Sequence, residues 1–244
     1  MDESYEQALS VVESTVHALT ERVPPPVRVT VGHGYAFRYA EKTIGQALVQ
    51  KLARLASGLR AANLLMEQGY LQEQGALQRM LDEIAEDIHF LAYAEVTGAK
   101  TQLHQEYLDA FYQEEFDAET AVESSQRRPS IPRRKIRTYL VEIETRGAER
   151  ERHREVGRTL SKLYSGYVHA ASPQIMDMYG GNPPRFRMRG NFDCDIYVEH
   201  SHDLWNYFYR ALLACGVSAK AVGDDDRCAR LVAYARDFAV QSGR

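Results

Sequence analysis

The sequence predicts an all-α protein, a bundle of seven to eight helices built around a long antiparallel helical hairpin. Nearly every long segment repeats its apolar residues at the spacing of one helix face. Two of the longest segments are separated only by a Gly-Tyr step, and no internal repeat or low-complexity tract interrupts the pattern. We therefore expect a single helical bundle domain over residues 38–244, preceded by an N-terminal helix and a proline-rich linker in residues 1–37.

The N-terminal region predicts a short amphipathic helix and then an extended linker. Residues 3–21 place four apolar side chains on one helical face: Leu9, Val12, Val16 and Leu19. A triple proline beginning at Pro24 ends this helix. Residues 27–35 alternate apolar and polar side chains as a strand does. Because we find no second strand to pair with this segment, we expect an extended linker here.

Two long helices joined by a short turn form the predicted centre of the bundle. The first covers about residues 38–68, and Gly69 supplies its C-terminal stop. The second covers residues 71–97 and ends at Gly98. A connection as short as Gly69-Tyr70 requires antiparallel neighbours, so the two helices should form a hairpin.

The remaining segments complete the predicted bundle. Residues 100–118 form a third helix, and residues 119–132, with Ser, Gln, Arg and two prolines, suit a flexible linker. Further helices are expected at about 133–146, 149–169, 172–179, 194–215 and 219–241, with Gly216 between the last two. Residues 180–191 have the composition of an ordered surface loop.

Composition and charge narrow the class of protein. The formal net charge is -4, so binding to nucleic acid must depend on a local patch rather than on overall attraction. Three cysteines without a CxxC motif argue against a disulfide framework or a zinc site. The N-terminus has no signal-peptide pattern, and no apolar run approaches the roughly 18 residues that span a bilayer. We expect a cytoplasmic protein with no membrane association and no cofactor.

A basic run, RRPSIPRRKIR, covers residues 127–137 and holds six Arg or Lys in eleven positions. Such a cluster at the junction of a loop and a helix can attract phosphates, and several contacts together form an electrostatic footprint for RNA. The alternative is a solvated linker that its own charges keep extended.

Two Glu-x-x-His pairs raise the question of a metal site. The pairs are Glu86…His89 and Glu199…His202. On a helix this spacing places both side chains on one face, and ferritin-like di-iron carboxylate bundles use two such pairs. About 0.7 accidental pairs are expected from the Glu and His content, so two pairs do not establish a site, and we assign no metal ligand.

His169 lies at the end of a predicted helix and is the main candidate for chemistry. Some helical ribonucleases place an arginine, then four to six intervening residues and then a histidine at the end of a helix, so that the cation stabilises phosphate charge while the imidazole moves a proton. This chain has Lys162 at the longest spacing, and Arg158 lies three helical turns before His169 on nearly the same face, about 16 Å from it along the helix axis. Alternatively, the His169 ring packs at the helix end and donates to a carbonyl there.

Three further groups of residues qualify as binding candidates. Arg79 and Glu83 have the i, i+4 spacing of a helical ion pair, which suits structure as well as binding. Tyr164 and Tyr167 precede His169 and either line a pocket or belong to the core. Arg187, in the loop 180–191, is placed to bind an anion near His169 or to face solvent.

The chain also resembles a group of bacterial helical proteins of unknown activity. Two patterns carry the resemblance, a long helix, a glycine and then an Arg-x-x-x-Glu helix, followed by Tyr-Ser-x-Tyr-Val-His. The matching residues are Arg79, Glu83, Tyr164, Ser165, Tyr167, Val168 and His169. This group is distantly similar to the HEPN superfamily of helical bundles, and the resemblance covers roughly residues 40–180.

The resemblance implies a homodimer, and so does the large apolar surface of the long helices. It also implies binding of RNA or a nucleotide with ribonuclease-type activity, in which His169 is the acid–base group and Lys162 or Arg158 its phosphate partner. Other HEPN-like proteins are non-catalytic dimerisation or interaction modules, which is the second hypothesis. The di-iron carboxylate bundle is the third.

Overall fold

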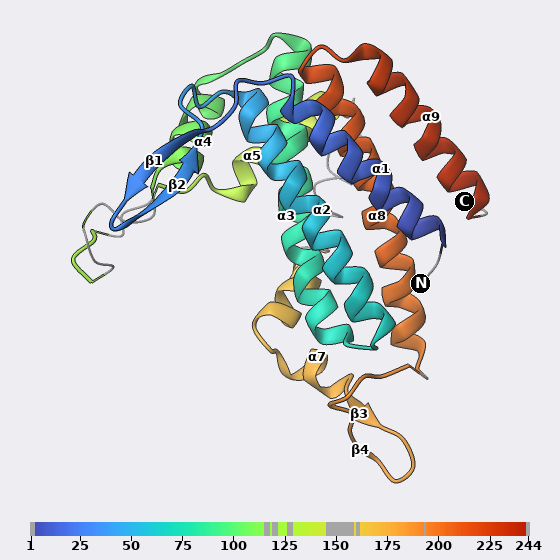
Figure 1. Cartoon of the computed structure of the whole chain (residues 1–244). Coiled ribbons are helices and arrows are strands. Elements are labelled where there is room, and N and C mark those ends of the chain that lie inside the picture. The colour runs from blue at the N-terminus through green and yellow to red at the C-terminus, as the bar shows by residue number, and fades with distance from the viewer. Residues whose placement is uncertain are drawn as a thin grey trace.

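A computed structural model describes residues 3–114, 118, 122–125, 129–144, 159, 162–192 and 194–242. The described chain is mostly helical and has two small two-stranded sheets (Figure 1). The helices are α1 (Glu3–Thr20), α2 (Ile44–Glu67), α3 (Leu71–Thr97), α4 (Gln102–Tyr112), α5 (Arg133–Glu144), α7 (Ser172–Met176), α8 (Asp195–Ala221) and α9 (Asp225–Gln241). The all-α prediction is therefore confirmed.

Helices α2 and α3 occupy the middle of the bundle and lie side by side (Figure 1). Thr43 caps α2, because its hydroxyl accepts from the backbone N–H of Gln46 while the Gln46 side chain accepts from that of Thr43. This capping box starts α2 six residues later than the predicted start at residue 38. The expected stop is present, since Gly69 adopts a φ of 67° between the two helices.

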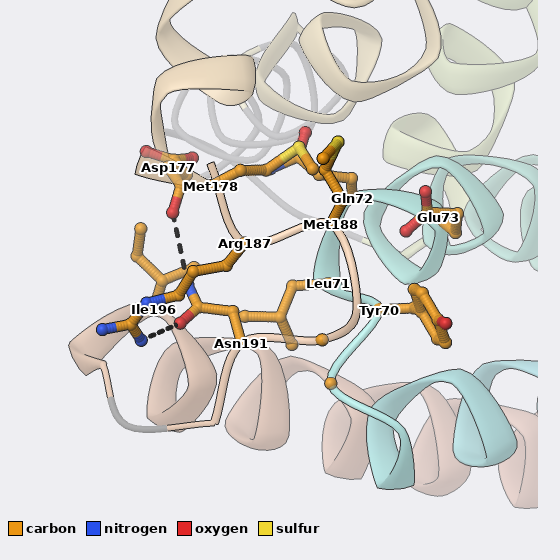
Figure 2. Close-up of a pocket in the computed structure, with 12 residues that line it drawn as sticks. Tyr70, Leu71, Gln72, Glu73, Asp177, Met178, Arg187, Met188, Asn191 and Ile196 are labelled. Atoms are coloured by element: carbon orange, nitrogen blue, oxygen red, sulfur yellow. Dashed lines mark hydrogen bonds between the residues drawn. The ribbon is translucent and has the colours of Figure 1, made fainter. Parts of the chain in front are cut away.

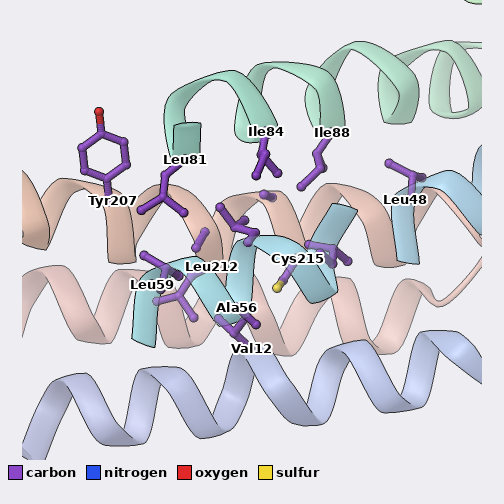
Figure 3. Packing of buried hydrophobic residues seen from close by; sticks show 14 of the residues in the cluster. Val12, Leu48, Ala56, Leu59, Leu81, Ile84, Ile88, Tyr207, Leu212 and Cys215 are labelled. Atoms are coloured by element: carbon purple, nitrogen blue, oxygen red, sulfur yellow. The ribbon is translucent and has the colours of Figure 1, made fainter. Parts of the chain in front are cut away.

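The core lies where α8 packs against α1, α2, α3 and α9 (Figure 3). The side chains of Leu59 on α2, Leu81 on α3 and Leu212 on α8 are all fully buried there. Cys215 belongs to the same cluster, and burial raises the pKa of its thiol to about 12. Among the described residues, none of the helices combines the length and apolar character needed to cross a bilayer.

The predicted break at Gly216 is wrong, because α8 continues through it to Ala221. A glycine inside a helix costs about 1 kcal/mol relative to alanine, and here the cost is offset by packing, since Gly216 faces Leu231 and Val232 of α9. The helix ends at Ala221, just before Gly223, where φ is 78°.

Residues 27–38 form a β-hairpin, so the predicted extended linker is also wrong. Strand β1 (Val27–Val31) pairs with β2 (Gly34–Arg38) in antiparallel register, with Val29 opposite Ala36. The second strand covers the end of the predicted linker and reaches Arg38, the first residue of the predicted helix. Figure 1 shows this hairpin extending away from the helices. We call residues 27–38 the arm.

A small subdomain covers the end of the α2–α3 pair. Residues 162–168 are helical, α7 follows, and β3 (Tyr179–Gly180) pairs with β4 (Arg185–Phe186) inside the predicted loop. The loop then docks on the α2–α3 turn through a hydrogen bond from the Asn191 N–H to the Gly69 carbonyl, 2.9 Å long. Parts of the predicted linker 119–132 and of the helix 149–169 lie outside the described residues.

Candidate functional site

A groove of about 690 Å³ runs between α3 and the end of the helical segment 162–168. Its α3 wall consists of Glu73, Ala76, Leu77, Arg79, Met80 and Glu83. The other wall consists of Ser165, Val168 and His169. The groove therefore brings together three residues named from the sequence, Arg79, Glu83 and His169.

His169 is exposed at the rim of this groove. The helical segment closes just before it, since the His169 N–H donates to the Ser165 carbonyl and Ala170 has a φ of 50°. Within the described part of the chain, the imidazole makes no hydrogen bond, neither to a helix-end carbonyl nor to a carboxylate. The ring is therefore accessible to a ligand rather than enclosed between helices.

Arg79 and Glu83 form the ion pair that their spacing predicts. Arg79 Nη2 lies 2.7 Å from Glu83 Oε1, and both side chains are partly buried, at 21% and 32% exposure. Glu83 also lies 3.7 Å from the Arg133 guanidinium. Two carboxylates and one guanidinium thus line the groove, and the guanidinium is already engaged by one of the carboxylates.

Tyr164 and Tyr167 lie behind the groove and are not part of its lining. Tyr164 is 4% exposed and its hydroxyl donates to Asp203, at 2.7 Å. The Tyr167 ring packs on Gly75 of α3, where a methyl group would lie 2.8 Å from the ring. Burial raises the pKa of both hydroxyls. These tyrosines hold the segment 162–168 against the bundle.

Tyr167 also belongs to a set of uncharged groups that we call the neutral network, formed by Gln74, Tyr167 and His200. The Tyr167 hydroxyl lies 3.1 Å from His200 Nε2, and His200 Nδ1 contacts Gln74 Oε1. Because an amide oxygen only accepts, Nδ1 carries the proton, and the unprotonated Nε2 faces the Tyr167 hydroxyl, which also interacts with the Asp177 carboxylate. Burial lowers the pKa of His200, against a weaker opposing effect of Asp203.

Arg187 points into a different and smaller cavity of about 30 Å³ (Figure 2). It donates to Asn191 Oδ1 at 2.6 Å, and the Asn191 amide donates to the carbonyl of Asp177 at 3.3 Å. These bonds fold the loop 187–191 onto itself. Arg187 and His169 therefore do not line the same pocket. Lys162 is exposed and outside the lining of the groove, and Arg158 lies outside the described residues.

Two of the four described basic residues of the run, Arg133 and Arg137, form ion pairs with the other half of α3. Arg133 binds Asp87 with two nitrogens, Arg137 Nε lies 2.6 Å from Glu86 Oε1, and Lys51 Nζ lies 2.7 Å from Asp87. We call Lys51, Glu86, Asp87, Arg133 and Arg137 the ionic cluster. Two of the six basic residues, Arg127 and Arg128, lie outside the described residues.

The ionic cluster perturbs its two carboxylates in opposite directions. Burial would raise the pKa of Asp87, but Lys51 and Arg133 together outweigh it and hold that pKa below its usual value. Burial and the nearby charge of Asp82 raise the pKa of Glu86, although Arg137 opposes them. Sequence reasoning noted the cations and missed their partners, which the acidic run from Asp82 to Asp87 contains.

The four residues of the di-iron hypothesis are all described, and they do not form a metal site. No group of three or more His, Cys, Asp or Glu side chains suited to a metal ion occurs among the described residues. The Glu86 carboxylate is paired with Arg137, and the His89 ring is bonded to the Ala85 carbonyl at 2.8 Å. Comparison of the chain with protein-family models, curated proteins and solved structures finds no match.

Proposed function

We propose that the protein is a non-catalytic interaction module, and that the groove beside His169 binds a segment of a partner protein. The segment has apolar side chains flanked by Lys or Arg. The observation that carries this proposal is the lining of the groove. Its floor is apolar and is bordered by Glu73 and Glu83, and the Arg79 guanidinium, the one guanidinium among the described lining residues, is already paired with Glu83. The resemblance to HEPN-like interaction modules agrees with it.

The apolar part of the groove supports binding of side chains from a partner. Leu77 and Met80 of α3 are partly exposed, and Val168 opposite them is 50% exposed. Removing apolar surface from water contributes about 25 cal/mol for each Å². A groove with a volume near 690 Å³ has room for a few such side chains.

The charges of the groove favour a basic segment over a polyanion. Glu73 is exposed, and Glu83 forms an ion pair with Arg79. A phosphodiester chain entering here would meet two carboxylates before it met an available cation, and like charges repel during association. Lys or Arg residues of a partner would be attracted to the same two positions.

A peptide display library tests the proposal. Selection on the wild-type protein should enrich sequences with apolar residues beside Lys or Arg, and the enriched peptide should lose about tenfold in affinity on Glu73→Lys. Glu142→Lys, an exposed charge reversal on α5, is the matched control and should leave affinity unchanged. Enrichment of acidic peptides, or equal affinity for Glu73→Lys, would contradict the proposal.

The second candidate function is RNA or nucleotide binding with cleavage. The observation that favours it is the accessible His169 ring, which lines the same groove as Arg79. Incubation of RNA with the protein in EDTA tests it. Cleavage that is lost in His169→Ala and reduced in Lys162→Ala would support this function, whereas identical RNA profiles for all three proteins would leave the interaction module.

A further inference from the structure

We propose that the arm joins two copies of this chain, and that β1 of one copy pairs antiparallel with β1 of the other around a twofold axis. The arm is a two-stranded hairpin that leaves the bundle (Figure 1). An isolated hairpin of two strands is marginally stable in water, and a third or fourth strand stabilises it. This inference is independent of the groove.

Four large apolar side chains of the arm are exposed to solvent. The exposed fractions are 48% for Val27, 52% for Val31, 56% for Tyr35 and 60% for Phe37. Strand β1 holds no proline and no bulge, and its single charged side chain, Arg28, lies over the Tyr35 ring of β2, 3.7 Å from the ring centroid. Exposed apolar groups on an unprotected edge are typical of a surface that another strand covers.

The hairpin's own register determines which backbone groups of β1 face outward. Gly32 and His33 form a two-residue loop, and Gly32 has a φ of 54°, which fits a type II′ turn. The turn hydrogen bond closes between Val31 and Gly34, so alternate residues of β1 bond to β2. The N–H and C=O groups of Arg28 and Thr30 therefore point away from β2. Within the described residues, no backbone hydrogen bond reaches that outer edge.

Only one twofold register satisfies all of these outward groups. If Val29 lies on the axis, Arg28 of each copy bonds to Thr30 of the other, and four hydrogen bonds form. Centring on Arg28 would place two like charges opposite each other and oppose Thr30 to Pro26, which has no N–H. Centring on Thr30 would oppose Arg28 to the turn residue Gly32.

The sequence VRVTV is self-complementary in this register. Val27 lies opposite Val31 of the other copy, and the two Val29 residues face each other, so valine pairs with valine along one side of a four-stranded sheet. On the other side each Arg28 faces a threonine. Strand β2 suits this role less, because Arg38 is bound to Glu114 and also donates to the Phe37 carbonyl.

A cysteine on the axis tests the register. Facing residues in a pair of strands have Cβ atoms about 4.5–5.5 Å apart, close enough for a disulfide after a small shift. In a background with Cys194→Ser and Cys228→Ser, mild oxidation of Val29→Cys should give a covalent dimer. Thr30→Cys is the matched control and should give no covalent dimer, because residue 30 of one copy faces Arg28 of the other. Dimer from Thr30→Cys and none from Val29→Cys would overturn the proposal.

Charges on the axis test the assembly without a covalent bond. Light scattering should show wild-type protein forming dimers as its concentration rises, since five-residue strands bury less than the roughly 800 Å² per partner of a standard interface. Val29→Lys and Val29→Glu should each be monomeric, and an equal mixture should dimerise again. An unchanged helical circular dichroism signal will show that each variant is folded. A wild-type monomer at every concentration, or dimers of Val29→Lys alone, would overturn the proposal.

Discussion

Helix α3 buries its polar groups in two ways, as neutral groups near its N-terminus and as ion-paired carboxylates from Asp82 onward. Its C-terminal half contributes Glu86 and Asp87 to the ionic cluster, where every charge depends on a partner from α2 or α5. Its N-terminal half contributes Gln74 to the neutral network, where no member carries a charge. Removing one member of a buried ion pair leaves an unpaired charge, whereas removing one neutral group leaves an unmade hydrogen bond, which costs less.

The sharpest test of this comparison removes one charge from the ionic cluster. Asp87→Asn keeps the shape of the side chain and leaves Lys51, 12% exposed, and Arg133 without their shared countercharge. We expect the free energy of unfolding to fall by about 4 kcal/mol in urea titrations. Asp225→Asn removes an exposed pair with Lys220 and should have a far smaller effect, because water screens the two charges. Equal effects would mean that burial does not matter here.

The next test disrupts the neutral network by a steric clash with Tyr167, without changing any charge. Gly75→Ala places a methyl group 2.8 Å from the Tyr167 ring and pushes the tyrosine away from His200. Overpacking of this kind costs about 2 kcal/mol, which thermal unfolding measures. The cost should shrink in a Tyr167→Ala background, because the two sites are coupled. A cost that is the same in both backgrounds would mean that the added methyl group does not act through Tyr167, since helix propensity alone favours alanine over glycine.

A third test asks whether α3 has polar groups that neither arrangement satisfies. Gln78 lies between the two on the same helix, is fully buried, and has no hydrogen-bond partner for its amide within the described residues. Leucine has a volume similar to that of glutamine and no polar atoms in its side chain. Gln78→Leu therefore removes the buried amide without hydrogen bonds, and we expect the free energy of unfolding to rise by about 1 kcal/mol. Gln78→Ala, which opens a cavity, should instead destabilise the protein.

The smallest expected effect is a difference in the pH dependence of stability between the neutral network and the ionic cluster. Burial lowers the pKa of His200, so its contribution to stability is present above the ordinary histidine value and is lost as pH falls through its folded pKa. The pKa of Asp87 is also lowered, but its contribution is lost only in stronger acid, below the ordinary aspartate value.

Urea midpoints at about pH 7.5 and about pH 5.5 measure this difference. Wild-type protein should be less stable at the lower pH, and His200→Gln should show a smaller drop. Burial lowers the pKa of His89 and His104 in the same direction, so some dependence will remain. The same drop in His200→Gln as in wild type would show that the neutral network does not titrate.

The fold was predictable where local chemistry decides it, and less so elsewhere. Gly69 and Gly98 marked helix ends correctly because a left-handed residue is needed there. Gly216 misled the prediction because its neighbours on α9, which make a glycine tolerable inside a helix, come from later in the chain. The arm was missed although Gly32-His33 between two alternating segments is a hairpin signal.

The candidate site was predictable only in part. The spacing of Arg79 and Glu83 indicated their ion pair, since both lie on one helix. That Ser165 and His169 meet these residues in one groove depends on how the segment 162–168 docks on α3, and Gly75, which permits that docking, carries no such signal by itself. The partners of Arg133 and Arg137 lie about 50 positions away on a different helix.

The buried thiol of Cys215 can report how often the helical bundle opens. Cys215 is fully enclosed between helices and stays protonated, whereas Cys194 and Cys228 are partly accessible. An alkylating reagent should therefore add mass to Cys215 only during the moments when the bundle separates. The rate at which Cys215 is alkylated reports how often the helices come apart under native conditions, without denaturant.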